Sequence, residues 1–194
     1  MDVPAPGQDA ANSTNLSTFV QAFLLPEKLH SMQEASLSEE KRAQLTRAPH
    51  LASQFPAAVD INHSPVVLIC GHGGRDMRCG IMAPVLESEF ARILGTRGFS
   101  TDNSNTIDSP DNAHIGLISH VGGHKYAGNV IVYIPPEMKM RDSNPNPLAG
   151  KGIWYGRVEP KHVEGIVEET LLGGRVVMDH FRGGIGRNGE ILRL

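Results

Sequence analysis

The clearest pattern in the chain is an unbroken run of apolar residues at positions 66–69, with the sequence VVLI. A run of this length is typical of a β-strand buried on both faces. Similar short runs predict strands over 115–118, 129–134 and 153–158, and a last short strand over 175–178. The second half of the chain is therefore predicted to form a β-sheet.

Two segments of this half have helical periodicity instead. Apolar residues recur three or four positions apart over 82–93, where Pro84 is acceptable in a first helical turn. A second helix is expected to begin at Pro160 and to present an apolar face through Leu171. The element order β-α-β-β-β-α predicts an α/β fold, in which a mixed β-sheet is flanked by helices that cover its faces.

The first third of the chain has a different composition, which sets the predicted domain boundaries. Residues 1–17 are rich in small polar residues and are expected to be a disordered tail. Residues 18–63 are interpreted as an irregular, partly helical N-terminal arm or linker. The compact domain is predicted over 64–185, and a Gly/Arg-rich C-terminal tail over 186–194.

One helix of the arm has a recognisable start. Ser36 and Glu39 have the spacing of a capping box, so a helix is expected from there through Leu45. Arg182 and Arg187, near the other end of the chain, are expected to be solvated.

Charge and hydropathy exclude several classes of function. The chain has 194 residues and a net charge of −3, without a stripe rich in Lys and Arg, so nucleic-acid binding is not predicted. No segment approaches the roughly 20 apolar residues that cross a bilayer, so no membrane association is predicted. Residues 1–27 contain no Lys or Arg, which argues against a secretory signal and against an Arg-rich mitochondrial presequence.

The candidate chemistry lies in two short motifs, each at the end of a predicted strand. Cys70 and Cys79 are the two cysteines of the chain and flank the loop of CGHGGRDMRC. His120 and His124 belong to HVGGH. If the two strands are neighbours, both loops open at the same end of the sheet. Thiolates and imidazoles then converge as a potential metal site.

The loop between the cysteines suits an anionic sulfur site. Its three glycines leave backbone N–H groups unobstructed, and Arg75 and Arg78 supply positive charge near the thiolates. His72, in the same loop, is expected not to be a ligand.

The residues alone leave three occupants open. Zinc accepts two cysteines and two histidines, but the spacing is not that of a zinc finger. A 2Fe–2S cluster with the same ligand types is the Rieske pattern, although Cys79 is not followed by a second C-x-x-H. A reversible Cys70–Cys79 disulfide would make the chain a thiol–disulfide oxidoreductase, although eight intervening residues differ from the C-x-x-C of such enzymes.

The segment of about residues 64–185 resembles the sucrase/ferredoxin-like family, and within it the fungal branch named for altered inheritance of mitochondria. The resemblance rests on CGHGGRDMRCG, HVGGH and GIWYGRVEPKHVEGIVEETLLGG. It implies a thioredoxin-like ferredoxin fold and a 2Fe–2S cluster ligated by Cys70, Cys79, His120 and His124. Family members are usually longer, with an N-terminal half that is missing here or reduced to residues 18–60.

The resemblance also implies an electron carrier rather than a turnover enzyme, with a role in mitochondrial redox homeostasis. Its partner would be an unidentified redox protein, and the chain itself is expected to be a monomer or a weak dimer. Two neutral imidazoles in place of thiolates would make the cluster less negative and raise its potential. Because a ligating imidazole has a second nitrogen that can bind a proton, redox behaviour is predicted to be proton-coupled.

Overall fold

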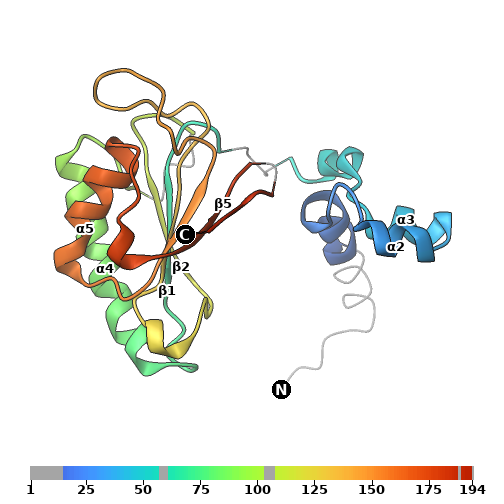
Figure 1. Cartoon of the computed structure of the whole chain (residues 1–194), viewed down its shortest axis with the longest axis horizontal. Coiled ribbons are helices and arrows are strands. Elements are labelled where there is room, and N and C mark those ends of the chain that lie inside the picture. Colours follow the sequence, from blue (N-terminus) through green and yellow to red (C-terminus); the bar gives the residue numbers. More distant parts are fainter. Residues whose placement is uncertain (1–14, 57–60, 103–107, 188, 194) are drawn as a thin grey trace, which may run out of the picture. The chain divides into compact units, whose positions relative to one another are not determined.

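The computed structural model describes residues 15–56, 61–102, 108–187 and 189–193 (Figure 1). The chain divides into two compact units, Met1–Val59 and Asp60–Leu194. Within the described ranges, no helix is both long and apolar enough to cross a membrane.

The N-terminal unit consists of short helices. Residues 15–19 are α-helical and continue into the π-helix η1, so the last residues of the expected disordered tail are helical, while 1–14 lie outside the described residues. The rings of Phe19, Phe23 and Phe55 pack together with centroids 5.2–5.7 Å apart. The elements are η1 Val20–Leu24, α2 Ser31–Ser36, α3 Glu39–Leu45 and the 3-10 helix η2 Pro49–Gln54.

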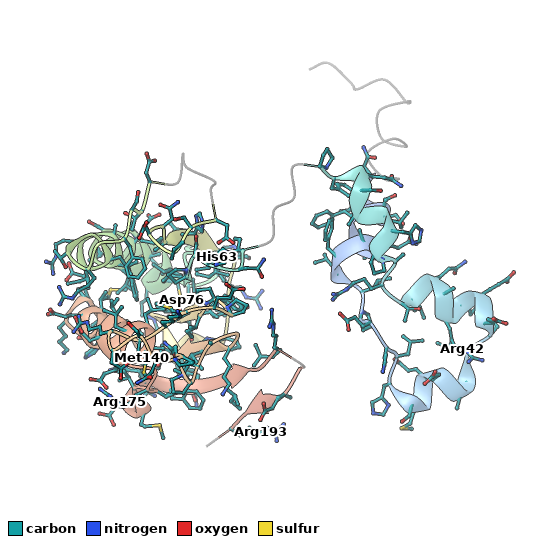
Figure 2. All side chains as sticks on the ribbon, turned by 90° about the horizontal axis from the view of Figure 1, so that it is seen from above. Arg42, His63, Asp76, Met140, Arg175 and Arg193 are labelled. Atoms are coloured by element: carbon teal, nitrogen blue, oxygen red, sulfur yellow. The ribbon has the colours of Figure 1, made fainter. Side chains whose placement is uncertain are left out.

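The predicted helix of the arm is present as α3 and ends at Leu45 as expected. Its N-cap is Ser38 rather than Ser36, because the Ser38 side chain accepts a hydrogen bond from the N–H of Lys41. Arg42 on α3, labelled in Figure 2, donates to the carbonyl of Leu37 at 3.0 Å.

The second unit contains a six-stranded sheet in the order β2-β1-β3-β4-β5-β6. Strands β1 and β2 are parallel, and each further neighbouring pair is antiparallel. The strands are β1 Val66–Cys70, β2 His114–Ile118, β3 Val130–Tyr133, β4 Gly152–Tyr155, β5 Phe181–Ile185 and β6 Ile191–Leu192.

Two main helices cover one face of this sheet. Helix α4, Met77–Thr96, connects β1 to β2, and α5, Pro160–Ile166, follows β4 and continues as the π-helix η4, Val167–Leu172. Figure 1 shows α4 and α5 side by side on the same side of the sheet, and they pack on each other. The short 3-10 helices are η3 His124–Tyr126 and η5 Met178–His180.

The α/β class and the mixed sheet flanked by helices are thus confirmed. A parallel β-α-β unit followed by an antiparallel β-β-α unit, in the strand order β2-β1-β3-β4, is the arrangement of thioredoxin-like proteins.

The two main helices lie on the same face of the sheet rather than one on each face. Because α4 and α5 bury their apolar faces against each other as well as against the sheet, both lie on one face. Val67 and Ile69 of β1 are fully buried on that side, whereas Leu68 alternates to the other face and is half-buried. The strand at 66–69 is therefore buried on one face only.

The C-terminal segment also differs from expectation. Residues 175–178 are not a strand, and β5 and β6 lie further on, with β6 inside the segment expected to be a tail. The sequence FRGGI of β5 does not alternate between apolar and polar residues, so its pattern does not predict a strand. It pairs with β4 through backbone N–H and C=O groups, and every residue type except proline has both groups.

Helix α4 begins earlier than predicted. Asp76 is its N-cap, and its side chain accepts from the N–H of Arg78, so Cys79 lies in the first helical turn rather than before the helix. Pro84 consequently lies inside the helix rather than in its first turn. Cys79 lies three residues before Met82 and continues the helical spacing of the apolar residues over 82–93, and it is buried.

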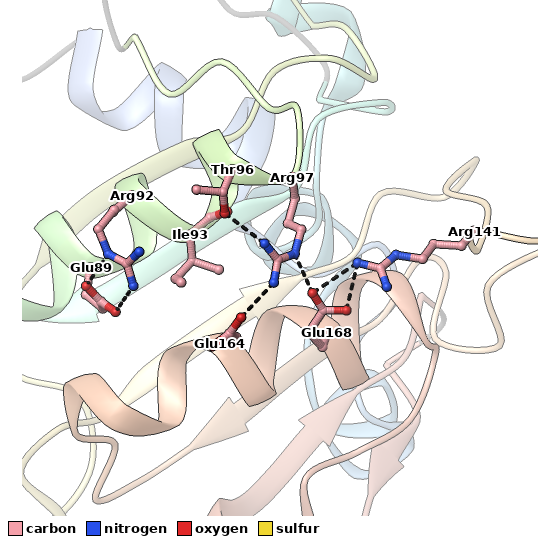
Figure 3. A network of polar contacts seen from close by, with 8 residues as sticks. All are labelled: Glu89, Arg92, Ile93, Thr96, Arg97, Arg141, Glu164 and Glu168. Atoms are coloured by element: carbon pink, nitrogen blue, oxygen red, sulfur yellow. Dashed lines mark hydrogen bonds and ion pairs between the residues drawn. The ribbon is translucent and has the colours of Figure 1, made fainter.

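A charged network fixes the C-terminal end of α4 to α5 and η4 (Figure 3). Arg97 donates to Glu164 Oε1 at 2.7 Å and also forms an ion pair with Glu168. Arg141, from the loop after β3, pairs with the same Glu168 carboxylate at 2.8 Å. The network connects three segments that are distant in the sequence.

Candidate metal centre

The candidate site lies at the edge of the sheet where β1 and β2 end. The two strands are parallel neighbours, and Cys70, the last residue of β1, is paired with Ile118, the last residue of β2. His120 follows two residues later. The sequence predicted that the two loops lie together only if the two strands are neighbours. Because β1 and β2 are parallel neighbours, both loops do leave the same edge of the sheet.

Three of the predicted ligands converge at this edge. The Sγ atoms of Cys70 and Cys79 and a ring nitrogen of His120 all lie within 4.8 Å of one another. Cys70 Sγ is 4.0 Å from His120 Nδ1. Both thiols are free and buried, with 2% and 1% of the residue surface exposed, and His120 is half-buried.

The fourth predicted ligand, His124, is described only through its backbone. It begins the turn η3, four residues after His120. Its side chain lies outside the described part of the structure.

Backbone groups approach both sulfur atoms. The N–H of Val121 donates to Cys70 Sγ at 3.5 Å. A backbone hydrogen bond from Gly128 acts on Cys79, in the direction that lowers the pKa of its thiol. Such N–H groups stabilise sulfur as an anion, as the glycine-rich motifs predicted.

The loop after Cys70 folds closely onto the first turn of α4. A Cβ atom on Gly80 would lie only 2.6 Å from the Cα atom of Gly73. Any side chain at position 80 would therefore push the loop away from the helix that carries Cys79. The glycines of this motif serve close backbone approach as well as access to N–H groups.

Asp76, labelled in Figure 2, is the acidic group of the site. Its carboxylate accepts from the Arg78 side chain at 2.9 and 3.1 Å, and its side chain is only 7% exposed. The charge of Arg78 acts on the adjacent Cys79, as expected, and a carboxylate also pairs with this guanidinium. Arg75 is exposed to solvent.

Burial, together with the adjacent Cys70 and the charge of Asp76, raises the pKa of the Cys79 thiol to about 11. At neutral pH this thiol holds its proton when no cation is near it. A metal ion reverses this balance, because a coordinated thiol loses its proton.

His72 does not belong to the converging group. It is exposed, and its Nδ1 lies 3.3 Å from the hydroxyl of Ser119. It therefore lies beside the candidate ligands, within the loop that carries Cys70.

Two features of the site region were not found from the sequence. Asn129 is buried, its carbonyl accepts from the N–H of Cys70 at 3.0 Å, and its Nδ2 has no hydrogen-bond partner within the described residues. The guanidinium of Arg182 lies 3.0 Å from the ring centre of Tyr126. The only signal in the sequence for the buried Asn129 is its position directly before an apolar run. Nothing in the sequence links Arg182 to Tyr126.

The fold and the site define an α/β protein with a candidate thiolate–imidazole metal centre at one end of its sheet. The model of the sucrase/ferredoxin-like family matches residues 4–183. The chain therefore belongs to the sucrase/ferredoxin-like family. The match begins well before the resembling segment of 64–185, so it also includes the whole N-terminal arm of 18–63.

Curated relatives agree with this assignment. Altered inheritance of mitochondria protein 32 of Clavispora lusitaniae is 38% identical over 175 residues, covering 87% of this chain and 52% of the relative. The protein of the same name from Meyerozyma guilliermondii is 34% identical over 169 residues, with 87% and 50% covered. Actin patches distal protein 1 of Saccharomyces cerevisiae is 42% identical over 106 residues, with 55% and 29% covered. The chain spans about half the length of the first two relatives.

Among solved structures, the chain is similar to the thioredoxin-like [2Fe-2S] ferredoxin of Aquifex aeolicus. The sequence identity is 19%, the TM-score is 0.40, and the alignment covers 61% of this chain and 90% of the ferredoxin.

Proposed function

We propose that the chain is an electron carrier whose 2Fe–2S cluster is held by Cys70, Cys79, His120 and His124. The observation that carries the proposal is the convergence of two buried thiols and an imidazole nitrogen within 4.8 Å at the end of parallel strands. When bound, such a cluster supplies one-electron redox chemistry.

The residues of the site fit this group in three respects. Thiolate and imidazole are ligands of iron in clusters of this class. Backbone N–H groups at Val121 and Gly128 approach the sulfur atoms and would stabilise negative charge on them. The buried position of both cysteines protects a cluster from solvent and oxidants.

The histidine ligands would couple electron transfer to the binding or release of a proton. A neutral imidazole that ligates through one nitrogen can bind or release a proton at the other. His120 is half-buried, so its ring retains access to solvent for this exchange. We therefore expect the redox potential to depend on pH.

The thiol–disulfide rival is less well supported by the geometry. Attack on a disulfide requires an accessible thiolate. Here both sulfur atoms are buried, and the pKa of Cys79 is raised to about 11, which leaves little thiolate at neutral pH.

A structural zinc site would use the same ligand types, so the two alternatives are distinguished by direct measurement of the bound metal. The chain purified without oxygen is expected to be coloured, with visible absorbance and stoichiometric iron and acid-labile sulfide. Cys70→Ser and Cys79→Ser are expected to abolish the colour, whereas Ser119→Ala, beside the site, is expected to retain it. A colourless protein with stoichiometric zinc would overturn the proposal.

The cellular role is proposed from the relatives. Two of them are named for altered inheritance of mitochondria, which supports a place in mitochondrial redox homeostasis. Fractionation of cells that express the whole protein at its native level tests this role. Exclusion of the protein from the mitochondrial fraction would contradict it.

A further inference from the structure

Three cationic side chains surround one aromatic ring beside the candidate centre. The guanidinium of Arg182, on β5, lies 3.0 Å from the ring centre of Tyr126. Lys125 Nζ lies 4.9 Å from this centre, and the guanidinium of Arg157, in the connection between β4 and α5, lies 5.2 Å from it. Cation–π attraction holds positive charges near the ring even though they repel one another. We name Lys125, Tyr126, Arg157 and Arg182 the Tyr126 surface.

These three charges have no acidic partner among the described residues, in contrast to several other arginines of the unit. Across the described ranges, Lys125, Arg157 and Arg182 form no ion pair with a carboxylate. Other exposed or half-buried arginines do form such pairs: Arg92 with Glu89, Arg97 with Glu164 and Glu168, Arg141 with Glu168, and Arg175 with Glu169.

Two carboxylates of this region are already paired: Glu159, which lines a pocket together with Lys125 and Arg157, and Asp76, the N-cap of α4. Asp76 pairs with Arg78 at 2.9 Å, and Glu159 pairs with Lys161 at 2.7 Å. The local excess of positive charge therefore remains, although the whole chain has a net charge of −3.

The surface continues into a shallow pocket and an apolar stripe. The pocket has a volume of about 340 Å³. Beside it, α4 exposes three apolar residues at helical spacing: Met77 at 73%, Ile81 at 64% and Val85 at 48%. The residues that line the pocket are Arg78, Met82, Lys125, Ala127, Arg157, Val158 and Glu159.

This surface adjoins the candidate ligands through the backbone. Arg78 directly precedes Cys79, and Lys125 directly follows His124. The N–H of Arg157 bonds the carbonyl of Tyr126. Figure 1 shows the turn η3, in yellow, next to the beginning of α4. A molecule bound here would lie next to the cluster of the proposed function.

We propose that the Tyr126 surface, with the adjoining stripe of α4, docks an acidic face of the protein that exchanges electrons with this chain. The inference rests on the proposed electron-carrier function. Cations without an acidic partner attract an acidic protein towards the centre. The apolar stripe favours a protein over a small anion, because only a protein surface is large enough to cover the stripe.

A binding experiment tests the surface without depending on the cluster. The probe is a labelled peptide of alternating Glu and Leu, titrated with the protein and followed by fluorescence anisotropy. The triple variant Lys125→Glu, Arg157→Glu, Arg182→Glu is expected to weaken binding roughly tenfold or more, and added salt is expected to weaken wild-type binding.

A matched control changes the net charge by the same amount elsewhere. Lys139→Glu, Lys151→Glu and Arg187→Glu lie in segments that leave the end of the sheet where β1 begins, away from the centre. This triple variant is expected to bind the peptide like the wild type. Equal weakening in both variants, or inorganic phosphate that binds at the surface while the peptide does not, would overturn the proposal.

Electron exchange provides the second readout. One electron passes from the reduced protein to hexacyanoferrate(III), an anion, or to hexaammineruthenium(III), a cation. Charge reversal at the Tyr126 surface is expected to slow the first reaction roughly tenfold or more and not the second. Thermal unfolding of the same variant verifies that it is folded.

The two proposals fail in different ways. A colourless protein would overturn the electron-carrier function, and the peptide titration would still test the surface. A coloured protein whose charge-reversed variant binds the peptide and reacts with hexacyanoferrate(III) like the wild type would overturn the docking surface alone.

Discussion

The sulfur of Cys70 lies 4.0 Å from Nδ1 of His120, although fifty positions separate the two residues in the chain. The parallel pairing of β1 with β2 produces this contact, since it brings the ends of both strands to one edge of the sheet. The chemistry of the site therefore depends on strand order as well as on residue type.

Replacing His120 tests the role of the imidazole. His120→Cys is expected to retain a cluster, to lower its reduction potential and to weaken the dependence of the potential on pH, because a thiolate is negative and has no second nitrogen to protonate. Redox titrations across the neutral to alkaline range measure both effects. His72→Gln, in the exposed loop beside the site, is the control and should leave the potential unchanged. A wild-type potential that does not vary with pH would contradict proton coupling.

Loading the site with iron and sulfide should release protons. The pKa of Cys79 is raised to about 11, so its thiol is protonated at neutral pH and must lose that proton on ligation. Reconstitution in two buffers of different ionisation enthalpy, followed by calorimetry, counts the protons released. Cys79→Ser is expected to release fewer, and an identical count in both proteins would refute the assignment of Cys79 as a ligand.

Gly80 is expected to be intolerant of any side chain. Gly80→Ala places a methyl group 2.6 Å from the Cα of Gly73, so the loop must move, which costs about 1–3 kcal/mol of stability. Gly165→Ala is a matched control in α5, where nothing lies within 4 Å of the new Cβ, and it should stabilise by about 0.5–1 kcal/mol. Denaturant unfolding compares the two variants. Equal stability of both would show that the close approach at Gly80 is not a constraint.

Tyr155 connects β4 to the segment that leads into β5. Its hydroxyl lies 2.6 Å from Thr170 Oγ1 and accepts from the N–H of Val177 at 3.2 Å. Tyr155→Phe leaves the buried hydroxyl of Thr170 and the half-buried N–H of Val177 without this partner, which should lower the free energy of unfolding by about 1–3 kcal/mol. Tyr133→Phe, on the exposed side of β3, should change it little. A loss of the same size in both variants would indicate an effect unrelated to these bonds.

Glu168 should contribute to stability in a pH-dependent way. Hydrogen bonding from Arg97, assisted by Arg141, lowers the pKa of Glu168 below its ordinary value of 4.5 (Figure 3). A carboxylate with a depressed pKa in the folded state stabilises above its unfolded pKa and loses this effect as the pH falls through its folded pKa. Glu168→Gln should therefore lower the melting temperature at neutral pH.

The same variant should converge with the wild type as the pH falls through the depressed pKa of the folded Glu168 carboxyl, where the wild type becomes protonated. Thermal unfolding at a series of pH values measures the difference. Glu190→Gln is a suitable control, because Glu190 forms no ion pair within the described residues. A deficit that persists unchanged into acid would contradict the electrostatic explanation.

The sequence by itself predicted the elements whose apolar pattern is strong. Strand β1, with its run of VVLI, and α5, with its apolar face after Pro160, were placed within a few residues. It also identified the two motifs that contain Cys70 and His120, because cysteine and histidine flanked by glycines have few other uses at strand ends. These features are local, because each is defined by residues that are close together in the sequence.

Tertiary structure decided the rest. Both helices pack on one face because their apolar sides bury each other, which no single segment specifies. The segment FRGGI forms strand β5 because its backbone pairs with that of β4. The hydropathy of a segment contains no information about such pairing. The meeting of Arg182 with Tyr126, and of Cys70 with His120, likewise depends on which strands are neighbours. Residue type sets what a site can bind, whereas long-range pairing sets which residues form it.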